Sequence, residues 1–308
     1  MQGQAQGTYY SILYYDEAQR DFTQQIDSLL DDFDLTASLW VEYSLLRKVN
    51  SNTDSVINDL FADLLAKSMQ INQFTEGAFD CSVGKLVRAW GFGFEAGKDL
   101  TDFQIDSLRQ YVGGEFQVYE NNGTTYLHKP SRETEIDFNA IAQGYSVDMV
   151  GKFLASKGIS NYLIDIGGEV IAHGSKSEGK PWCVGIEKPA AEKYEGRVVE
   201  TAISLKDQSV VTSGNYRKYY EKDGVRYSHT IDPSTGRPVT HNLLSVSVIA
   251  KEAWYADAMA TAFMVMGLER SLHFLESHPE IAGAYFIYSE GAEYKTFATE
   301  GFKQLLNK

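Results

Sequence analysis

The sequence contains few cysteines, few prolines and no long apolar run, and each shortage excludes a class of protein. Among its 308 residues are 2 cysteines and 6 prolines. Cys81 and Cys183 lie far apart and form no Cys-x-x-Cys pair, so they predict no zinc or redox motif. We expect two buried thiols, with one disulfide in an oxidising compartment as the alternative. Because no run of about 18 apolar residues occurs, we expect no membrane-spanning helix.

Basic residues are also scarce. Lys and Arg total 28 against 42 Asp and Glu, which gives a formal net charge of −14. This acidic balance argues against non-specific binding to nucleic acid or to an anionic membrane surface. A phosphate-containing substrate would therefore need local positive charge from a bound metal ion or from helix N-termini.

The sequence does contain enough apolar material for a large core, together with both helical and strand patterns. Hydrophobic residues make up 43% of the chain. Apolar residues recur at helical spacing in four segments: 16–38, 55–75, 101–113 and 251–267. Alternation and turn signals predict a strand over 8–15, a hairpin at Asn122-Gly123 and a strand pair around Gly167-Gly168. We therefore predict an α+β fold with a largely antiparallel sheet, in a single domain of residues 1–308 with one or two lobes.

One of these helices carries two oxygen-bearing side chains on an otherwise apolar surface. Lys251–Gly267 (KEAWYADAMATAFMVMG) reads as a buried helix that ends at its glycine. Asp257 and Thr261 are four residues apart and so share one helix face. Magnesium prefers oxygen ligands and leaves positions for substrate phosphates, so this pair is a candidate metal site. Alternatively, Asp257 caps the helix N-terminus and Thr261 bonds a carbonyl one turn earlier.

A second candidate site is Glu135–Asp148 (EIDFNAIAQGYSVD). We expect Asp137 to end a strand and Ala140–Gly144 to enter a helix. Small residues at such a junction leave the backbone open to a ligand, and the helix N-terminal amides attract anions. The alternative is an ordinary tight connection between a strand and a helix.

Two further stretches offer candidate residues. His229 lies on a predicted strand just before the turn Asp232–Gly236, where a histidine of near-neutral pKa could act as a general base. The alternative is a packed or solvent-facing strand residue. Trp90 and Phe92 flank Gly91 in a glycine-punctuated loop and could form the walls of a flat-ring pocket, with a core loop as the alternative. No P-loop, GxSxG, HExxH or kinase signature is present.

Seven segments, taken in order, resemble the ApbE family of FAD:protein FMN transferases. The resemblance runs from Gly7 to Gly267 and so covers most of the chain. The matching segments are SLLRKVN, GAFDCSVGKLVRAWGFG, IDFNAIAQGYSVD, YLIDIGGEV, VVTSGNYRKYY, SHTIDPSTGRPV and ADAMATA. The family implies a T-fold-like α+β architecture and a magnesium-dependent reaction. In that reaction FMN passes from FAD to a threonine or serine hydroxyl of an acceptor protein, and AMP is released.

The resemblance also implies roles for individual residues. The metal ligands would be Asp257, Thr261 and the backbone carbonyl of Ala140, and His229 would be the base for the acceptor hydroxyl. The implied flavin-nucleotide contacts are Trp40, which stacks on the adenine, Trp90, Gly91, Phe92, Asp137, Gln143 and the backbone near Ile231. Two positions depart from the family. Gln143 replaces a common lysine, so we expect one charge-assisted phosphate contact fewer, and Gln6 replaces a common methionine.

The family further implies partners and a location. Its usual acceptors are subunits of membrane redox complexes, such as sodium-pumping quinone reductases and Rnf-type complexes. Many members are exported lipoproteins, so we expect a periplasmic protein whose leader has been removed ahead of the polar start MQGQAQG. Two other functions remain open: an FAD pyrophosphatase, in which water replaces the acceptor hydroxyl at the same metal site, and a flavin-binding protein without turnover.

Overall fold

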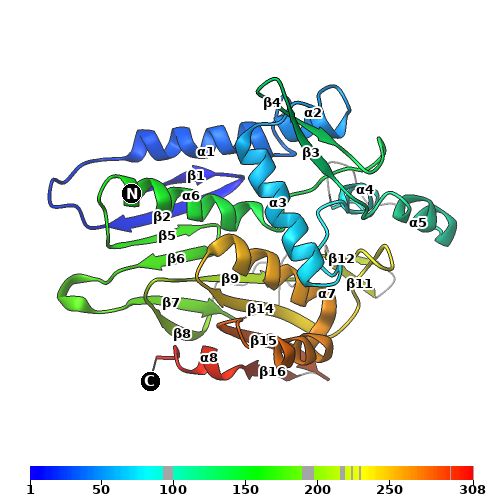
Figure 1. Cartoon of the computed structure of the whole chain (residues 1–308). Coiled ribbons are helices and arrows are strands. Elements are labelled where there is room, and N and C mark those ends of the chain that lie inside the picture. The colour runs from blue at the N-terminus through cyan, green and yellow to red at the C-terminus, as the bar shows by residue number, and fades with distance from the viewer. Residues whose placement is uncertain are drawn as a thin grey trace.

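A single antiparallel sheet of eight strands forms the centre of the part of the chain that the structure describes (Figure 1). The structure is a computed structural model, and it describes residues 1–92, 100–188, 198–215, 219–222, 225–228, 230–291 and 293–307. In spatial order the strands are β1 (Gln2–Ala5), β2 (Thr8–Tyr14), β5 (Tyr162–Ile166), β6 (Glu169–His173), β9 (Gln208–Gly214), β14 (Leu243–Ala250), β15 (Gly283–Glu290) and β16 (Glu293–Ala298). Every pairing in it is antiparallel.

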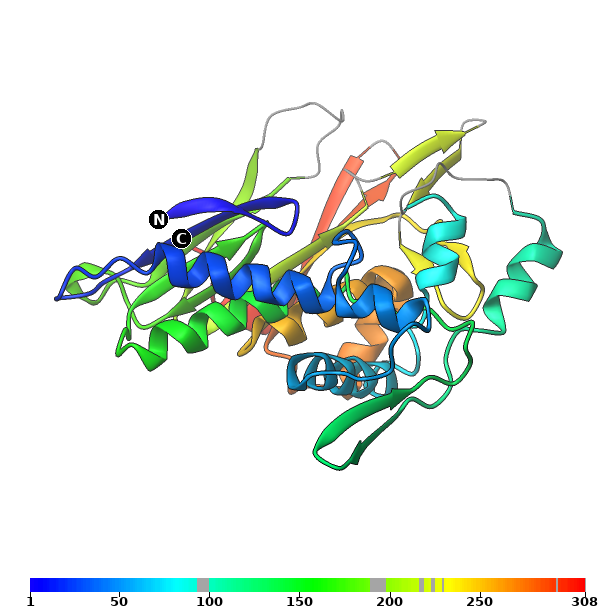
Figure 2. The ribbon, with the colours of Figure 1, turned by 90° about the horizontal axis from the view of Figure 1, so that it is seen from above.

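Helices cover one face of this sheet, as the two views of the ribbon show (Figures 1 and 2). The larger ones there are α1 (Thr23–Ala37), α3 (Asp59–Phe74), α6 (Ala142–Ser156) and α7 (Ala253–Ser277). Shorter helices are α2 (Leu45–Asn50), α4 (Gly84–Ala89), α5 (Asp102–Arg109) and α8 (Glu300–Lys303), with a 3₁₀ turn at Ser177–Gly179. The main apolar core lies between these helices and the sheet, and it includes Ile26, Phe61, Val150, Val248 and Phe263.

The opposite face of the sheet is covered by a hairpin of β7 (Trp182–Glu187) and β8 (Val199–Leu205), together with α8. Trp182, Ile203 and Phe302 pack there against Val210 and Ile287 of the sheet in a second, smaller core. Three further strand pairs complete the description: β3 (Gln117–Asn121) with β4 (Thr124–His128), β10 (Tyr219–Lys222) with β11 (Val225–Ser228), and β12 (Ile231–Asp232) with β13 (Arg237–Pro238).

The predicted α+β class and antiparallel sheet are confirmed. The strand predicted over 8–15 is β2, and Asn122 and Gly123 form the β3–β4 turn with positive φ angles of 52° and 75°. Three short elements were missed, β1, α2 and α8, because none is long enough to show a period. No helix among the described segments is both long and apolar enough to cross a membrane.

Three expectations need correction. The helix predicted to end at Gly267 does break there, with φ 75°, but it resumes and runs to Ser277 because Leu272 and Phe274 in the added turns pack on the core.

Asp137 does not end a strand, contrary to the second expectation. Glu135 makes only an isolated bridge to Val83, and the Asp137 N–H donates to the Cys81 carbonyl, so the segment is held by a loop.

The expectation of two buried thiols was correct for only one cysteine. Cys81 is buried and Cys183 is exposed, and both are free. Burial raises the pKa of the Cys81 thiol well above its usual range, so it stays protonated. Cys183 accepts a hydrogen bond from Asn307 Nδ2 at 2.9 Å.

Candidate active site

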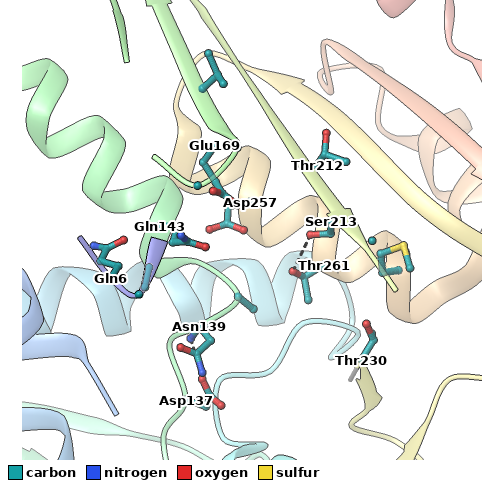
Figure 3. A pocket seen from close by; sticks show the side chains of 18 of the residues that line it. Gln6, Asp137, Asn139, Gln143, Glu169, Thr212, Ser213, Thr230, Asp257 and Thr261 are labelled. Atoms are coloured by element: carbon teal, nitrogen blue, oxygen red, sulfur yellow. Dashed lines mark hydrogen bonds between the residues drawn. The ribbon is translucent and has the colours of Figure 1, made fainter. Parts of the chain in front are cut away.

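A cavity of about 1130 Å³ lies where the central sheet opens between β6 and β9. These two strands pair only from Val170 and Val210 to Ala172 and Gln208. Beyond that ladder, the β5–β6 turn and the end of β9 line the cavity (Figure 3). Further walls come from α1, α6, α7 and β7, and from residues within the segments 78–92, 137–140 and 230–233. Segments from residue 6 to residue 265 therefore meet at one site.

Two helices remote in sequence, α6 and α7, cap each other at this cavity. Asp257 of α7 accepts a hydrogen bond from the Gly144 N–H in the first turn of α6, at 3.0 Å. Asp148 of α6 accepts from the Ala253 and Trp254 N–H groups at the start of α7, at 3.0 and 2.9 Å. Gly144 permits this approach, since a Cβ there would lie 2.4 Å from the Ala253 carbonyl oxygen. The carboxylates thus satisfy amides that a helix N-terminus leaves without partners.

Asp257 is a buried carboxylate in an environment that favours a cation. Only 5% of it is exposed, and burial raises its pKa to about 7. The Gly144 N–H acts in the opposite direction, and the charge of Asp148 raises the pKa further. A cation bound at this carboxylate would offset the cost of burying its charge.

Two more oxygens accompany it on the cavity wall. Among the described residues no N–H donates to the Ala140 carbonyl, because the Gly144 amide that would do so in a longer α6 is bonded to Asp257. Thr261 Oγ1 lies 3.4 Å from Ser213 Oγ, and Figure 3 shows it one turn along α7 from Asp257. In the described ranges, no three His, Cys, Asp or Glu side chains lie together so that they could hold a metal ion. The donors present are a carboxylate, a hydroxyl and a carbonyl, and this set fits a hard cation such as Mg²⁺.

Asp137 forms a second buried carboxylate on the wall. It is 7% exposed and accepts from the Asn139 N–H at 2.8 Å, and burial raises its pKa to about 6. Gln143 also lines the cavity from the first turn of α6. Gln6 lies beside Gln143 in Figure 3, on the β1–β2 turn, and accepts a hydrogen bond from Ser146 Oγ at 3.2 Å. The two positions that depart from the family therefore lie close together at the cavity.

The predicted aromatic residues take different positions. Trp40 is 58% exposed and stands on the cavity lining. Phe92 also lines the cavity, whereas Trp90 is buried behind it and donates through Nε1 to the Gly236 carbonyl at 2.8 Å. Gly91 links the two with φ 84°, a conformation that glycine adopts readily.

Two of the predicted site residues, His229 and Ile231, follow the β10–β11 hairpin, and the structure describes only Ile231. Ile231 is buried and lines the cavity together with Thr230 and Pro233. His229 lies outside the described residues, so its predicted role as base stays a prediction.

Sequence reasoning missed several wall residues. Asp80 is half-buried, accepts from Ser82 N–H and Oγ at 2.7 and 2.6 Å, and its pKa is raised because the carboxylate is partly removed from water. Glu169 follows the Gly167-Gly168 turn. A carboxylate set between glycines and apolar residues was the available signal at both positions. Cys183–Glu187 also line the cavity, and nothing in their sequence indicated it.

The chain is similar to known proteins over nearly its whole length. It matches the ApbE family over residues 6–286. It is 36% identical to an FAD:protein FMN transferase of Vibrio cholerae serotype O1, over 100% of this chain and 92% of that protein. The solved flavin transferase ApbE from Vibrio cholerae is similar with a TM-score of 0.85 at 36% identity, over 99% of this chain and 98% of that one. The solved structure of Pseudomonas stutzeri flavinyl transferase ApbE in its apo form is similar with a TM-score of 0.86 at 31% identity, over 99% of this chain and 95% of that one.

Together, the α+β fold, the oxygen-lined cavity and these likenesses define the class of protein as a flavinyltransferase, an enzyme that uses FAD. The chain belongs to the ApbE family. The resemblance stated from its seven sequence segments is thereby confirmed.

Proposed function

We propose that this enzyme transfers FMN from FAD to a threonine or serine hydroxyl of an acceptor protein, with Mg²⁺ bound at Asp257, Thr261 and the Ala140 carbonyl. The observation that carries the proposal is the convergence of these three oxygens on one cavity. The cavity volume of about 1130 Å³ is ample for a dinucleotide, since small-molecule pockets span roughly 300–1,000 Å³.

The reaction balances without any other reactant. The acceptor hydroxyl oxygen forms a bond to the FMN phosphorus, the pyrophosphate bond of FAD breaks, and AMP leaves with the bridging oxygen. The hydroxyl proton passes to a base, for which we propose His229. Mg²⁺, when bound, would supply charge neutralisation and orientation for the two phosphates.

The chain's own residues then position the substrate. The Gly144 amide holds the Asp257 carboxylate in place, which orients the metal ligand without using its second oxygen. We propose that Trp40 stacks on the adenine, that Asp137, Gln143 and the backbone near Ile231 contact the nucleotide, and that Phe92 contacts it while Trp90 and Gly91 support the loop. Since Gln143 is uncharged, we expect the phosphates to depend more strongly on the metal than in a lysine-bearing relative.

We also propose the wider setting. The acceptor is a subunit of a membrane redox complex, and the protein acts as a single domain of residues 1–308 at the periplasmic face as a lipoprotein with its leader removed. The family resemblance is the support for these points. Cell fractionation followed by immunoblotting with an antibody against this protein would test whether it lies in the periplasmic fraction.

The test is intact-mass spectrometry of an acceptor domain incubated with enzyme, FAD and Mg²⁺. We expect a gain of one FMN less one water that disappears when Mg²⁺ is chelated. Asp257→Asn keeps an oxygen for the Gly144 N–H but removes the charge, so we expect transfer to fall by about 100-fold or more with the fold retained. Asp106→Asn makes the same change at an exposed position of α5 that does not line the cavity, so it controls for the loss of one negative charge.

The outcomes separate the alternatives. Free FMN and AMP with an unmodified acceptor would favour the pyrophosphatase. Bound FAD without turnover would favour a flavin-binding protein. Near-normal transfer by Asp257→Asn would contradict the metal assignment.

A further inference from the structure

Strand β7 has one edge that pairs with nothing in the described structure. β7 pairs with β8 alone, in antiparallel register, with Cys183 opposite Ser204 and Gly185 opposite Ala202. The outer edge of β8, by contrast, is occupied by the chain's C-terminal segment. The Ser204 N–H donates to the Leu305 carbonyl at 2.8 Å, and the Asn307 N–H donates to the Ala202 carbonyl at 2.9 Å.

These bonds determine which backbone groups of β7 point away from the hairpin. In an antiparallel ladder, opposed residues alternate between pairs that bond each other and pairs whose N–H and C=O groups point outward. Ser204 and Ala202 bond outward, so their partners Cys183 and Gly185 do so as well. None of the described residues bonds these two N–H groups or these two carbonyls. The free edge of β7 therefore offers two donors and two acceptors in strand spacing.

This edge borders the cavity. Five consecutive residues, Cys183–Glu187, line it, although successive side chains of a strand point to opposite faces. Trp182 and Ile186 are buried against the central sheet, while Cys183 is exposed. A lining that includes both faces means that the cavity runs along the strand edge.

The neighbouring surface is apolar. Leu13 and Tyr15 are 53% and 50% exposed, and the Tyr15 ring lies 5.9 Å from that of Trp182. Leu13 pairs with Leu163, which itself lines the cavity. A chain laid along β7 would therefore cover the exposed side chains of Leu13 and Tyr15 before it reaches the cavity.

From this arrangement we infer that the acceptor protein binds as an extended strand added to the free edge of β7. Its backbone pairs with Cys183 and Gly185, its inward side chains at alternate positions are apolar and cover Leu13 and Tyr15, and its hydroxyl-bearing residue enters the cavity. Backbone pairing gives affinity that does not depend on acceptor sequence, and strand addition to an exposed edge is an established mode of peptide recognition. The inference rests on the proposed transfer to a protein acceptor.

The test removes one outward donor while leaving the hairpin intact. Cys183→Pro deletes an N–H that makes no bond to β8, and proline is tolerated on edge strands. Cys183→Ala is the matched variant, since both lose the thiol contact with Asn307 but only the proline loses the amide. Steady-state FMN transfer to a purified acceptor domain of a sodium-pumping quinone reductase subunit, at saturating FAD and Mg²⁺, gives the KM for acceptor. Fluorescence titration gives the Kd for FAD.

We expect the acceptor KM of Cys183→Pro to exceed that of Cys183→Ala by about tenfold, with the Kd for FAD equal within about twofold. We also expect the amides of Cys183 and Gly185 to exchange with deuterium more slowly when acceptor is added to the wild-type enzyme. Equal KM values for the two variants, or unchanged exchange, would overturn the inference.

Other outcomes are equally decisive. A raised Kd for FAD in Cys183→Pro with an unchanged acceptor KM would assign the edge to the nucleotide. A wild-type dimer that Cys183→Pro dissociates, with no change in acceptor KM, would assign it to a second copy of the chain. If the wild-type enzyme binds FAD but modifies no acceptor, the proposed function itself has failed, and unchanged amide exchange with acceptor present would show separately that the edge does not bind it.

Discussion

At the residue scale, two aspartates show how position determines the cost of a charge. Asp148 and Asp257 each accept hydrogen bonds from the start of the other's helix. Burial raises the pKa of Asp148 to about 6, even though its two N–H donors act in the opposite direction. The alternative in which Asp257 caps its own helix is therefore wrong, because its carboxylate turns to α6.

The raised pKa of Asp148 predicts a specific dependence of stability on pH. An acid with a raised folded pKa binds its proton more tightly in the native state, so the contribution of Asp148 to stability is fully present at low pH and is lost as the pH rises to about 6. We expect the free energy of unfolding of wild type, relative to Asp148→Asn, to fall by about 1–3 kcal/mol between pH 4 and 7. Urea unfolding in the presence of EDTA measures it. Parallel pH curves for the two proteins would contradict the prediction.

At the element scale, α6 and α7 approach each other closely at the site, because Gly144 has no side chain. Two glycines of α6 are buried, but they face different surroundings. A Cβ at Gly144 would lie 2.4 Å from the Ala253 carbonyl oxygen of α7, whereas one at Gly151 would lie 3.2 Å from the Tyr162 hydroxyl. Only the first contact is with rigid backbone, so only the first glycine sets the distance between the helices.

These glycines form a matched pair of variants. We expect Gly144→Ala to lower the free energy of unfolding by about 2 kcal/mol or more, since the two helices must separate. Gly151→Ala should stay within about 1 kcal/mol of wild type, because the better helix propensity of alanine offsets a small shift of the tyrosine. Chemical denaturation measures both. Equal effects would show that the α6–α7 contact can relax at no cost.

At the scale of the whole molecule, substrate and metal binding are expected to be interdependent. The net charge of −14 repels a dinucleotide, and the cavity carries buried carboxylates at Asp137 and Asp257. A cation between those carboxylates and the phosphates would remove both repulsions. The binding site also draws on distant segments of the chain, so ligand binding should stabilise the whole fold.

We therefore expect FAD and Mg²⁺ together to raise the melting temperature more than the sum of their separate effects. At about 100 times the Kd, one bound ligand adds about 2.7 kcal/mol, which corresponds to several degrees. Differential scanning calorimetry at low ionic strength measures it, with Ca²⁺ as a control for charge alone. Additive shifts would contradict coupled binding, and Asp257→Asn should lose the magnesium-dependent part.

Much of the fold was predictable because its signals are local. Asn122-Gly123 predicts its hairpin because a tight turn needs two residues of positive φ, and Gly267 predicts a helix break for a similar reason. The length of α7 beyond that break was not predictable, since it depends on core contacts of Leu272 and Phe274. The exposure of Cys183 depends in the same way on which strand forms the edge of a sheet.

The candidate site likewise has a part that local sequence patterns predict and a part that depends on tertiary packing. By itself the sequence determined which side chains are available, because the four-residue spacing of Asp257 and Thr261 places two oxygens on one helix face wherever that helix packs. Only the tertiary structure decided what those oxygens meet. The Ala140 carbonyl becomes available because Asp257, 113 positions from Gly144, takes the amide that would otherwise bond it. Hydrogen-bond competition of this kind arises only after remote helices have packed, so no local pattern in the sequence contains it.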